Sequence, residues 1–245
     1  MPDELAEKVS GIGALVEPVR RALYLYVASQ PDAVSREQAA TGVGVPLHSA
    51  KFHLDRLVEE GLLEVEFRRL SGKTGPGAGR PSKLYRRSLR EVSVSLPERR
   101  YDLAGDVLAS AIDRAIRDRV PVDVAVREAA TAQGRRLAAA FVAEGQEAEP
   151  PGEASRPAGG GSGLARTAQV LARHGYEPRT AEDEVCLANC PFDRLATEHT
   201  ELVCGMNLAL IDGVIDGLGV PGVCAELAPE PGLCCVKVTN CETAP

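Results

Sequence analysis

Seven cysteines lie close together near the C-terminal end of this 245-residue chain. All of them fall between Cys186 and Cys241. In a protein of cytoplasmic character, structural disulfides are disfavoured, and clustered cysteines more often bind a metal or carry out redox chemistry. This segment is therefore where chemistry is expected.

Four of the seven cysteines lie in three short stretches, 187–192, 202–204 and 231–236. Gaps of 13 and 29 residues separate Cys190, Cys204 and Cys234, so only a folded domain can bring them together. Thiolates are the protein ligands that iron–sulfur clusters use most, and a cubane takes four at most. Zinc ribbons carry paired Cys-x₂₋₄-Cys units, which only Cys186 and Cys190 approach. The pattern favours an iron–sulfur cluster, [4Fe–4S] with [2Fe–2S] as the alternative, over zinc or a thiol switch.

The charge is divided unevenly along the chain. Residues 1–100 carry 16 Lys/Arg against 13 Asp/Glu, whereas residues 101–245 carry 12 against 22, which makes the net charge −7. An acidic chain can still bind DNA when its positive charge is concentrated on one face. The apolar runs are far shorter than the ~20 residues of a membrane span. Because the first residues also lack an apolar signal core, we expect a cytoplasmic protein with no membrane partner.

Helix signals and a hairpin fill the first 90 residues. Helices are predicted over 18–28, from an N-cap at Ser35 to Ala40, and over 46–60; strands are predicted over 62–69 and 83–87. In the third helix Ala50, Leu54, Leu57 and Val58 have the spacing of one buried stripe. This order of helix, helix, turn, helix and hairpin is typical of a winged helix.

Two segments of this domain carry the residues expected to contact DNA. A major groove admits one helix, which must present polar side chains while its back is packed. The polar residues off the apolar stripe of the third helix are His48, Ser49, Lys51, His53 and Arg56. Packing is an equally good interpretation for His53. Between Phe67 and Arg90 there are eight basic residues and no acidic one, so this hairpin is expected to contact phosphates or the minor groove through Lys73, Arg80 and Lys83.

The rest of the chain reads as two helices, a linker and a small mixed domain. Helices are predicted over 97–117 and 122–143, and again within 164–171 and 192–218, with short strands around Val185 and over 235–238. The expected fold class is α+β. Its expected parts are a winged-helix DNA-binding domain over 1–92, a helical dimerisation region over 93–144, a flexible linker over 145–163, and a cysteine-rich sensor domain over 164–245.

Three segments resemble known regulators. Residues 48–54, with Leu57 and 61–63, resemble the recognition helix of arsenical-repressor-type winged-helix regulators, and Gly79-Arg80-Pro81-Ser82-Lys83-Leu84-Tyr85 resembles the wing of the Suf-operon repressors of iron–sulfur-cluster assembly. The cysteine stretches resemble the C-terminal domain of the same repressors.

The resemblance implies a ligand set for the cluster. It assigns Cys190, Cys204 and Cys234 as ligands and favours Cys235 as the fourth. Cys224 is the alternative fourth ligand, and Cys186 and His199 are weaker candidates. Cys186 and Cys241 are expected to be unpaired thiols.

These features predict a transcriptional regulator, a repressor rather than an enzyme. We expect a homodimer that reads a palindromic double-stranded operator, with the cluster sensing redox state, iron–sulfur status or nitric oxide. One alternative is a zinc-stabilised regulator without cluster sensing. Another is an iron–sulfur enzyme that carries a nucleic-acid-binding module, although no catalytic triad, phosphate loop or carboxylate pair stands out.

Overall fold

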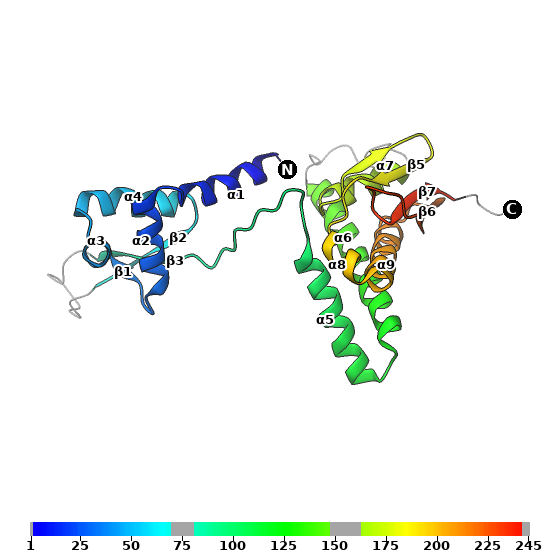
Figure 1. The fold of residues 1–245 in the computed structure, drawn as a ribbon, viewed down its shortest axis with the longest axis horizontal. Coiled ribbons are helices and arrows are strands. Elements are labelled where there is room, and N and C mark those ends of the chain that lie inside the picture. The colour runs from blue at the N-terminus through cyan, green and yellow to red at the C-terminus, as the bar shows by residue number, and fades with distance from the viewer. Residues whose placement is uncertain (1, 70–80, 148–162, 242–245) are drawn as a thin grey trace. The chain divides into compact units, whose positions relative to one another are not determined.

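The computed structural model describes residues 2–69, 81–147 and 163–241 (Figure 1). They belong to two compact units, Met1–Val94 and Ser95–Pro245. Within the described ranges, no helix is both long enough and apolar enough to cross a membrane. The predicted linker falls almost entirely on residues 148–162, which lie outside the described residues.

Over its described residues, 2–69 and 81–94, the first unit contains four helices and a three-stranded sheet. Its elements are α1 (Pro2–Ala14), α2 (Pro18–Ser29), β1 (Val34–Ser35), α3 (Arg36–Val43), α4 (Leu47–Glu59), β2 (Leu63–Arg68) and β3 (Ser82–Arg87). The sheet is antiparallel in the order β1-β3-β2, and Val65 of β2 lies opposite Tyr85 of β3. The predicted helices and hairpin are present within a few residues of their expected bounds. Helix α1 and strand β1 were not predicted.

Local signals explain where the helices of the first unit begin and end. Ser35 and Gln38 form a reciprocal capping box at the start of α3, with each side chain accepting from the other's backbone N–H. Gly44 ends α3 in the left-handed region at φ 75°, a conformation that glycine adopts without steric cost. Ser35 and Gln38 therefore fix the start of α3, and Gly44 sets the turn that leads to α4.

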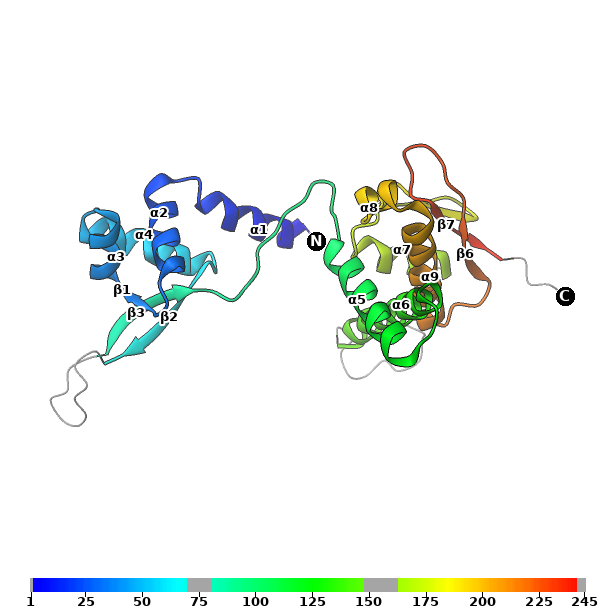
Figure 2. The ribbon, with the colours of Figure 1, turned by 60° about the horizontal axis from the view of Figure 1, so that its bottom comes forward.

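In the part of the second unit that the structure describes, residues 95–147 and 163–241, there are five helices and a four-stranded sheet. Its elements are α5 (Tyr101–Asp118), α6 (Val122–Glu147), α7 (Gly163–Ala172), β4 (Pro178–Thr180), β5 (Glu184–Leu187), α8 (Asp193–Glu198), α9 (Thr200–Leu218), β6 (Val223–Leu227) and β7 (Val236–Asn240). The sheet is antiparallel in the order β4-β5-β7-β6. Helix α6 runs beside α9, and α5 folds back along α6 (Figures 1 and 2). Strands β4 and β6 were not predicted.

One core joins all layers of the second unit. It includes Leu103 and Val107 of α5, Leu210 of α9, and Val185 and Val238 of the sheet, all nearly inaccessible to solvent. Helices α6 and α9 approach closely because Gly134 faces the backbone of Leu210, and Gly213 faces that of Thr131. Helices α5 and α6, expected to form a separate dimerisation region over 93–144, therefore belong to the same compact unit as the cysteines.

Candidate functional site

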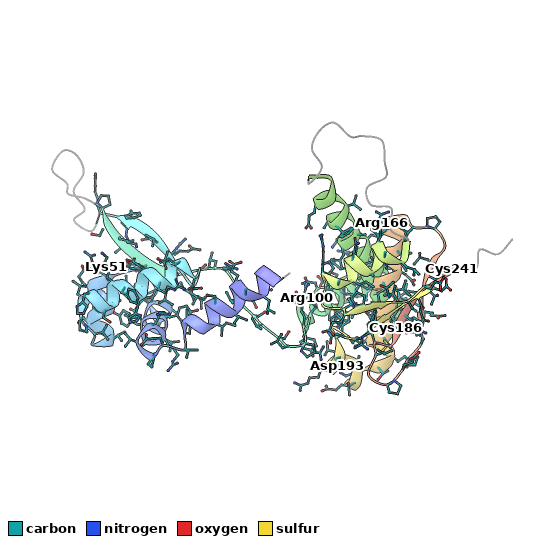
Figure 3. All side chains as sticks on the ribbon, turned by 90° about the horizontal axis from the view of Figure 1, so that it is seen from above. Lys51, Arg100, Arg166, Cys186, Asp193 and Cys241 are labelled. Atoms are coloured by element: carbon teal, nitrogen blue, oxygen red, sulfur yellow. A yellow bond between two sulfur atoms is a disulfide. The ribbon has the colours of Figure 1, made fainter. Side chains whose placement is uncertain are left out.

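Helix α4 has one buried face and one polar exposed face. Ala50, Leu54 and Leu57 are fully buried against the first unit's core. The opposite face presents His48, Lys51, Phe52 and Arg56 to solvent, and Figure 3 labels Lys51 on it. These residues, with Arg20, Asp55 and Glu59, line a surface hollow of about 560 Å³. Phe52, 65% exposed, was not predicted as a site residue, although its place beside Lys51 in the helical repeat could have indicated it.

His53 and Ser49 lie nearer the packed side of α4, and both are partly buried. His53 Nδ1 accepts a hydrogen bond from Arg20 Nε at 3.4 Å and lies 3.6 Å from Glu17 Oε2. Glu17 is the residue that caps α2. His53 thus ties the recognition helix to the start of α2, which is the packing role foreseen as its alternative.

Asp55 connects the recognition helix to the returning strand of the hairpin. Its Oδ1 accepts from Lys83 Nζ at 2.5 Å and from the Tyr85 hydroxyl at 3.0 Å. Burial raises the pKa of Asp55, but these two hydrogen bonds outweigh it and hold the pKa below its ordinary value. Lys83 therefore fixes the wing to α4 as well as supplying positive charge. Lys73 and Arg80 lie outside the described residues.

Four cysteines from three segments meet in the second unit. Cys190 follows β5, Cys204 lies in the second turn of α9, and Cys234 and Cys235 precede β7. Cys204 and Cys234 are buried, and Cys190 and Cys235 are half-buried. The backbone N–H of Cys234 donates to Leu187 O at 2.8 Å, which brings its loop beside the loop of Cys190.

The two adjacent cysteines escape the alternation of a regular strand. Successive side chains in a strand point to opposite faces, but β7 begins only at Val236. The turn before them contains Gly232 at φ 77°. Cys234 and Cys235 therefore both interact with the same group of thiols.

The thiols interact with one another through hydrogen bonds. Interactions with Cys190 and Cys235 lower the pKa of Cys234, and the same interactions together with burial raise the pKa of Cys190 and of Cys235. Cys235 also interacts with Cys204. The protonation of these thiols is therefore coupled and belongs to the group rather than to one cysteine.

The other three cysteines lie apart from this group. Cys186 has Glu184, Lys237 and Glu230 as its charged neighbours. Cys224 and Cys241 form a disulfide. The expectation that Cys241 is unpaired is thus wrong, and Cys224 is not free to act as the alternative fourth ligand, because β6 and the end of β7 are neighbouring strands that bring the two sulfurs together. Figure 3 labels Cys186 and Cys241.

His199 also lies away from the thiols. It forms the junction between α8 and α9, where it is exposed. It lines a hollow with Asp123 and Arg127 of α6 instead.

The loop of Cys190 is hydrogen-bonded to the segment that precedes α5. Arg99 donates to Cys190 O at 3.0 Å and to the Asn189 side-chain oxygen, and it pairs with Asp193 at 3.4 Å. The Asn189 amide in turn donates to Glu98 O at 2.9 Å and to Gly175 O. Residues 98–99 thus hold the loop of Cys190.

Asn207 and Tyr176 extend the cysteine group into the core. Asn207 Nδ2 donates to Cys234 Sγ at 3.1 Å, and its Oδ1 accepts from the Tyr176 hydroxyl. Both side chains are almost completely buried. Sequence reasoning missed this pair, but a signal existed: Asn207 is a polar residue in an apolar helix, three positions after Cys204 and hence on the same face.

The donor set suits a soft metal centre in its chemistry. Four thiols gather, and thiolates select zinc, Cu(I) and iron–sulfur clusters. Among residues 2–69, 81–147 and 163–241, however, no group of three or more His, Cys, Asp or Glu side chains is arranged so that it could hold a metal ion. The thiols contact one another, and binding would require them to turn toward a common centre.

Comparison with known proteins gives a match to a family model, and that match lies in the first unit. Residues 15–66 match a family model described as a helix-turn-helix domain. No curated protein and no solved structure matches the chain. The match covers α2 to β2, including the recognition helix, and it indicates a DNA-binding transcriptional regulator rather than an enzyme.

Proposed function

We propose that this helix-turn-helix protein is a homodimeric repressor whose affinity for a palindromic operator is controlled by an iron–sulfur cluster bound to Cys190, Cys204, Cys234 and Cys235. The observation that carries the proposal is the gathering of these four thiols from three separate segments. When bound, such a cluster supplies a redox-active centre whose potential depends on hydrogen bonds to its sulfurs. Four thiols suit a [4Fe–4S] cluster, which we propose, and equally a [2Fe–2S] cluster, which is the alternative.

The exposed face of α4 supports the DNA-binding half. Lys51 and His48 project from a helix whose back is packed, as a major-groove reader requires. Asp55 and Lys83 hold the hairpin against that helix, so both elements would reach one duplex together. Phosphate contacts would come from the basic hairpin.

Helix α5 supports the proposal of a dimer. Ile112 and Ile116 are 50% and 74% exposed on this helix, whereas Leu103, Val107 and Ala111 face the core. Large apolar side chains that repeat on one exposed helical face are typical of a protein–protein interface. A second copy of the chain would cover them in a two-fold arrangement.

The contacts of Arg99 support a route from the cysteines to the DNA-binding unit. This arginine holds the carbonyl of Cys190, and the chain immediately before it leads to residue 94, where the first unit ends. A change in the Cys190 loop would alter how this segment is held. Coupling of about 1–3 kcal/mol between the two ends would suffice for a switch.

Anaerobic purification with quantification of iron, sulfide and zinc tests the proposal. We expect about four iron and four sulfide ions per chain for a [4Fe–4S] centre. A duplex selected from a random DNA library by the same protein then serves to compare the affinity of the cluster-loaded and cluster-free forms. The two affinities are expected to differ by at least about fivefold.

Three other outcomes would each replace a part of the proposal. Stoichiometric zinc without iron or sulfide would replace the cluster with a structural zinc site. Cysteines that hold no metal and form disulfides reversibly would make the group a thiol switch. Equal DNA affinity in the two forms would leave the regulator without cluster control.

A further inference from the structure

We infer that Asn207 is the positioning residue of the thiol group, with its side-chain amide holding the Cys234 sulfur in place for a soft metal centre and Tyr176 fixing the orientation of that amide. The inference deepens the proposed function, on which it rests, by assigning the outer shell of the same site. It depends on contacts of fully buried groups within one unit.

The geometry defines a chain of three groups. Asn207 Nδ2 donates to Cys234 Sγ at 3.1 Å, and Asn207 Oδ1 accepts from the Tyr176 hydroxyl. Asn207 has no exposed surface, and Tyr176 is 2% exposed. Phe192, two residues after Cys190, packs edge-on against the Tyr176 ring with 6.4 Å between the ring centroids. The tyrosine is therefore held from the side of the Cys190 loop.

The orientation of the amide follows from its two partners. An asparagine amide has a donating end and an accepting end, and the choice between them comes from the hydrogen-bond network. Cys234 Sγ lies 3.1 Å from one end of the amide, and the Tyr176 hydroxyl lies at the other end. An accepting sulfur requires the N–H end, and the hydroxyl of Tyr176 then donates to the other end.

A purely structural role would not require an asparagine at this place. The side chain lies in the core formed by α9 and the sheet, where leucine has the same branched heavy-atom shape, with larger methyl groups, and needs no hydrogen-bond partner. The amide satisfies no backbone group among its described hydrogen bonds, which go only to Cys234 and Tyr176. What it does there is fix the position of one sulfur.

Outer-shell groups of this kind orient a ligand and tune the metal that it binds. Loss of such a partner typically lowers metal affinity about 10–100-fold. In a cluster, an N–H that points at a ligand sulfur also stabilises the more negative, reduced state. Removal of the Asn207 amide is therefore expected to weaken metal binding and to lower the reduction potential.

Cobalt binding to the cluster-free full chain tests the inference. Anaerobic titration with Co²⁺ is followed by thiolate-to-metal charge-transfer absorbance. We expect Asn207→Leu to weaken binding about 10–100-fold with the same number of thiolates bound, and Asn207→Gln to recover part of the loss. Because Asn207→Leu leaves the Tyr176 hydroxyl without a partner, the double variant Asn207→Leu/Tyr176→Phe repeats the test with both polar groups removed.

Thr167→Val is the matched control. Thr167 is also fully buried in the second unit, and its hydroxyl donates to Gly163 O at 2.9 Å, within α7. Its Co²⁺ affinity should equal that of the wild type. The inference is overturned if Asn207→Leu and the double variant Asn207→Leu/Tyr176→Phe bind Co²⁺ as tightly as wild type. It is also overturned if Thr167→Val weakens binding equally, or if wild type shows no thiolate charge transfer. Dependence on Asn207 in a protein purified without iron or sulfide would support the inference and reject the cluster.

Discussion

The recognition helix and the cysteine group differ in how their residues are brought together. Helix α4 takes all its functional side chains from 13 consecutive residues, and their spacing alone places them on one exposed face. The cysteine group takes four side chains from two loops and helix α9, over a span of 46 residues, and its members are buried or half-buried. Damage to the helix surface should therefore change binding without changing the fold, whereas damage to the cysteine group should reach both its chemistry and its packing.

The largest expected effect is loss of the cluster on Cys234→Ser. Oxygen is a poor replacement for a soft thiolate, and Cys234 interacts with both Cys190 and Cys235. Iron and sulfide after anaerobic purification should fall close to zero. Cys190→Ser, Cys204→Ser and Cys235→Ser should also lose or destabilise the cluster.

Two cysteines outside the group provide controls for that experiment. Cys186→Ser and Cys241→Ser should retain iron and sulfide, because neither side chain belongs to the group. Helical content of the first unit should be unchanged in every variant, since its core is separate. Equal cluster loss in Cys186→Ser and Cys234→Ser would remove the distinction between the four cysteines and the rest.

A smaller effect is expected from Lys51→Ala on the recognition helix. If Lys51 contacts a base edge, operator affinity should fall by about 1–3 kcal/mol with a smaller loss on random DNA. Fluorescence anisotropy with both duplexes at fixed salt measures this. Arg194→Ala removes another exposed cation, from α8, and should leave both affinities unchanged. Lys51 would be excluded from the interface by wild-type affinity on both duplexes.

Arg99→Ala tests whether the two regions communicate. We expect the variant to keep its iron and sulfide but to lose most of the difference in DNA affinity between loaded and cluster-free protein, a coupling of about 1–3 kcal/mol in the wild type. The control is Arg127→Ala, whose partner Asp123 lies on the same helix. An undiminished difference in the Arg99 variant would show that the signal takes another route.

The smallest effect is expected for Asp55→Asn, which loosens the wing from α4. The folded state lowers the pKa of Asp55, so its stabilisation is present above the unfolded pKa of about 3.9 and is lost as the pH falls through the lower folded value. Because the pair is partly exposed, we expect the loss at pH 7 to be less than about 1 kcal/mol. Urea denaturation followed by circular dichroism at pH 7 and pH 3 measures it. A destabilisation as large at pH 3 as at pH 7 would contradict this origin.

The winged helix was predictable because its signals are local. The N-cap at Ser35, the turn at Gly44 and the stripe of Ala50, Leu54 and Leu57 each act over fewer than ten residues, and each is found where expected. Helix α1 and strands β1, β4 and β6 were missed. Strands β1 and β4 are two and three residues long, too short for an alternating pattern to be recognised.

The amino-acid sequence by itself determined the recognition helix, the hairpin and the set of cysteines able to do chemistry, since residue type and helical period decide those features. Only the tertiary structure decided which cysteines meet. It brought the thiols of Cys234 and Cys235 into one group although the two residues are adjacent in the sequence, and it paired Cys224 with Cys241. It also placed Asn207 and Arg99 in contact with that group. Contacts between residues far apart in the chain depend on how helices and strands pack, and no local pattern encodes that packing.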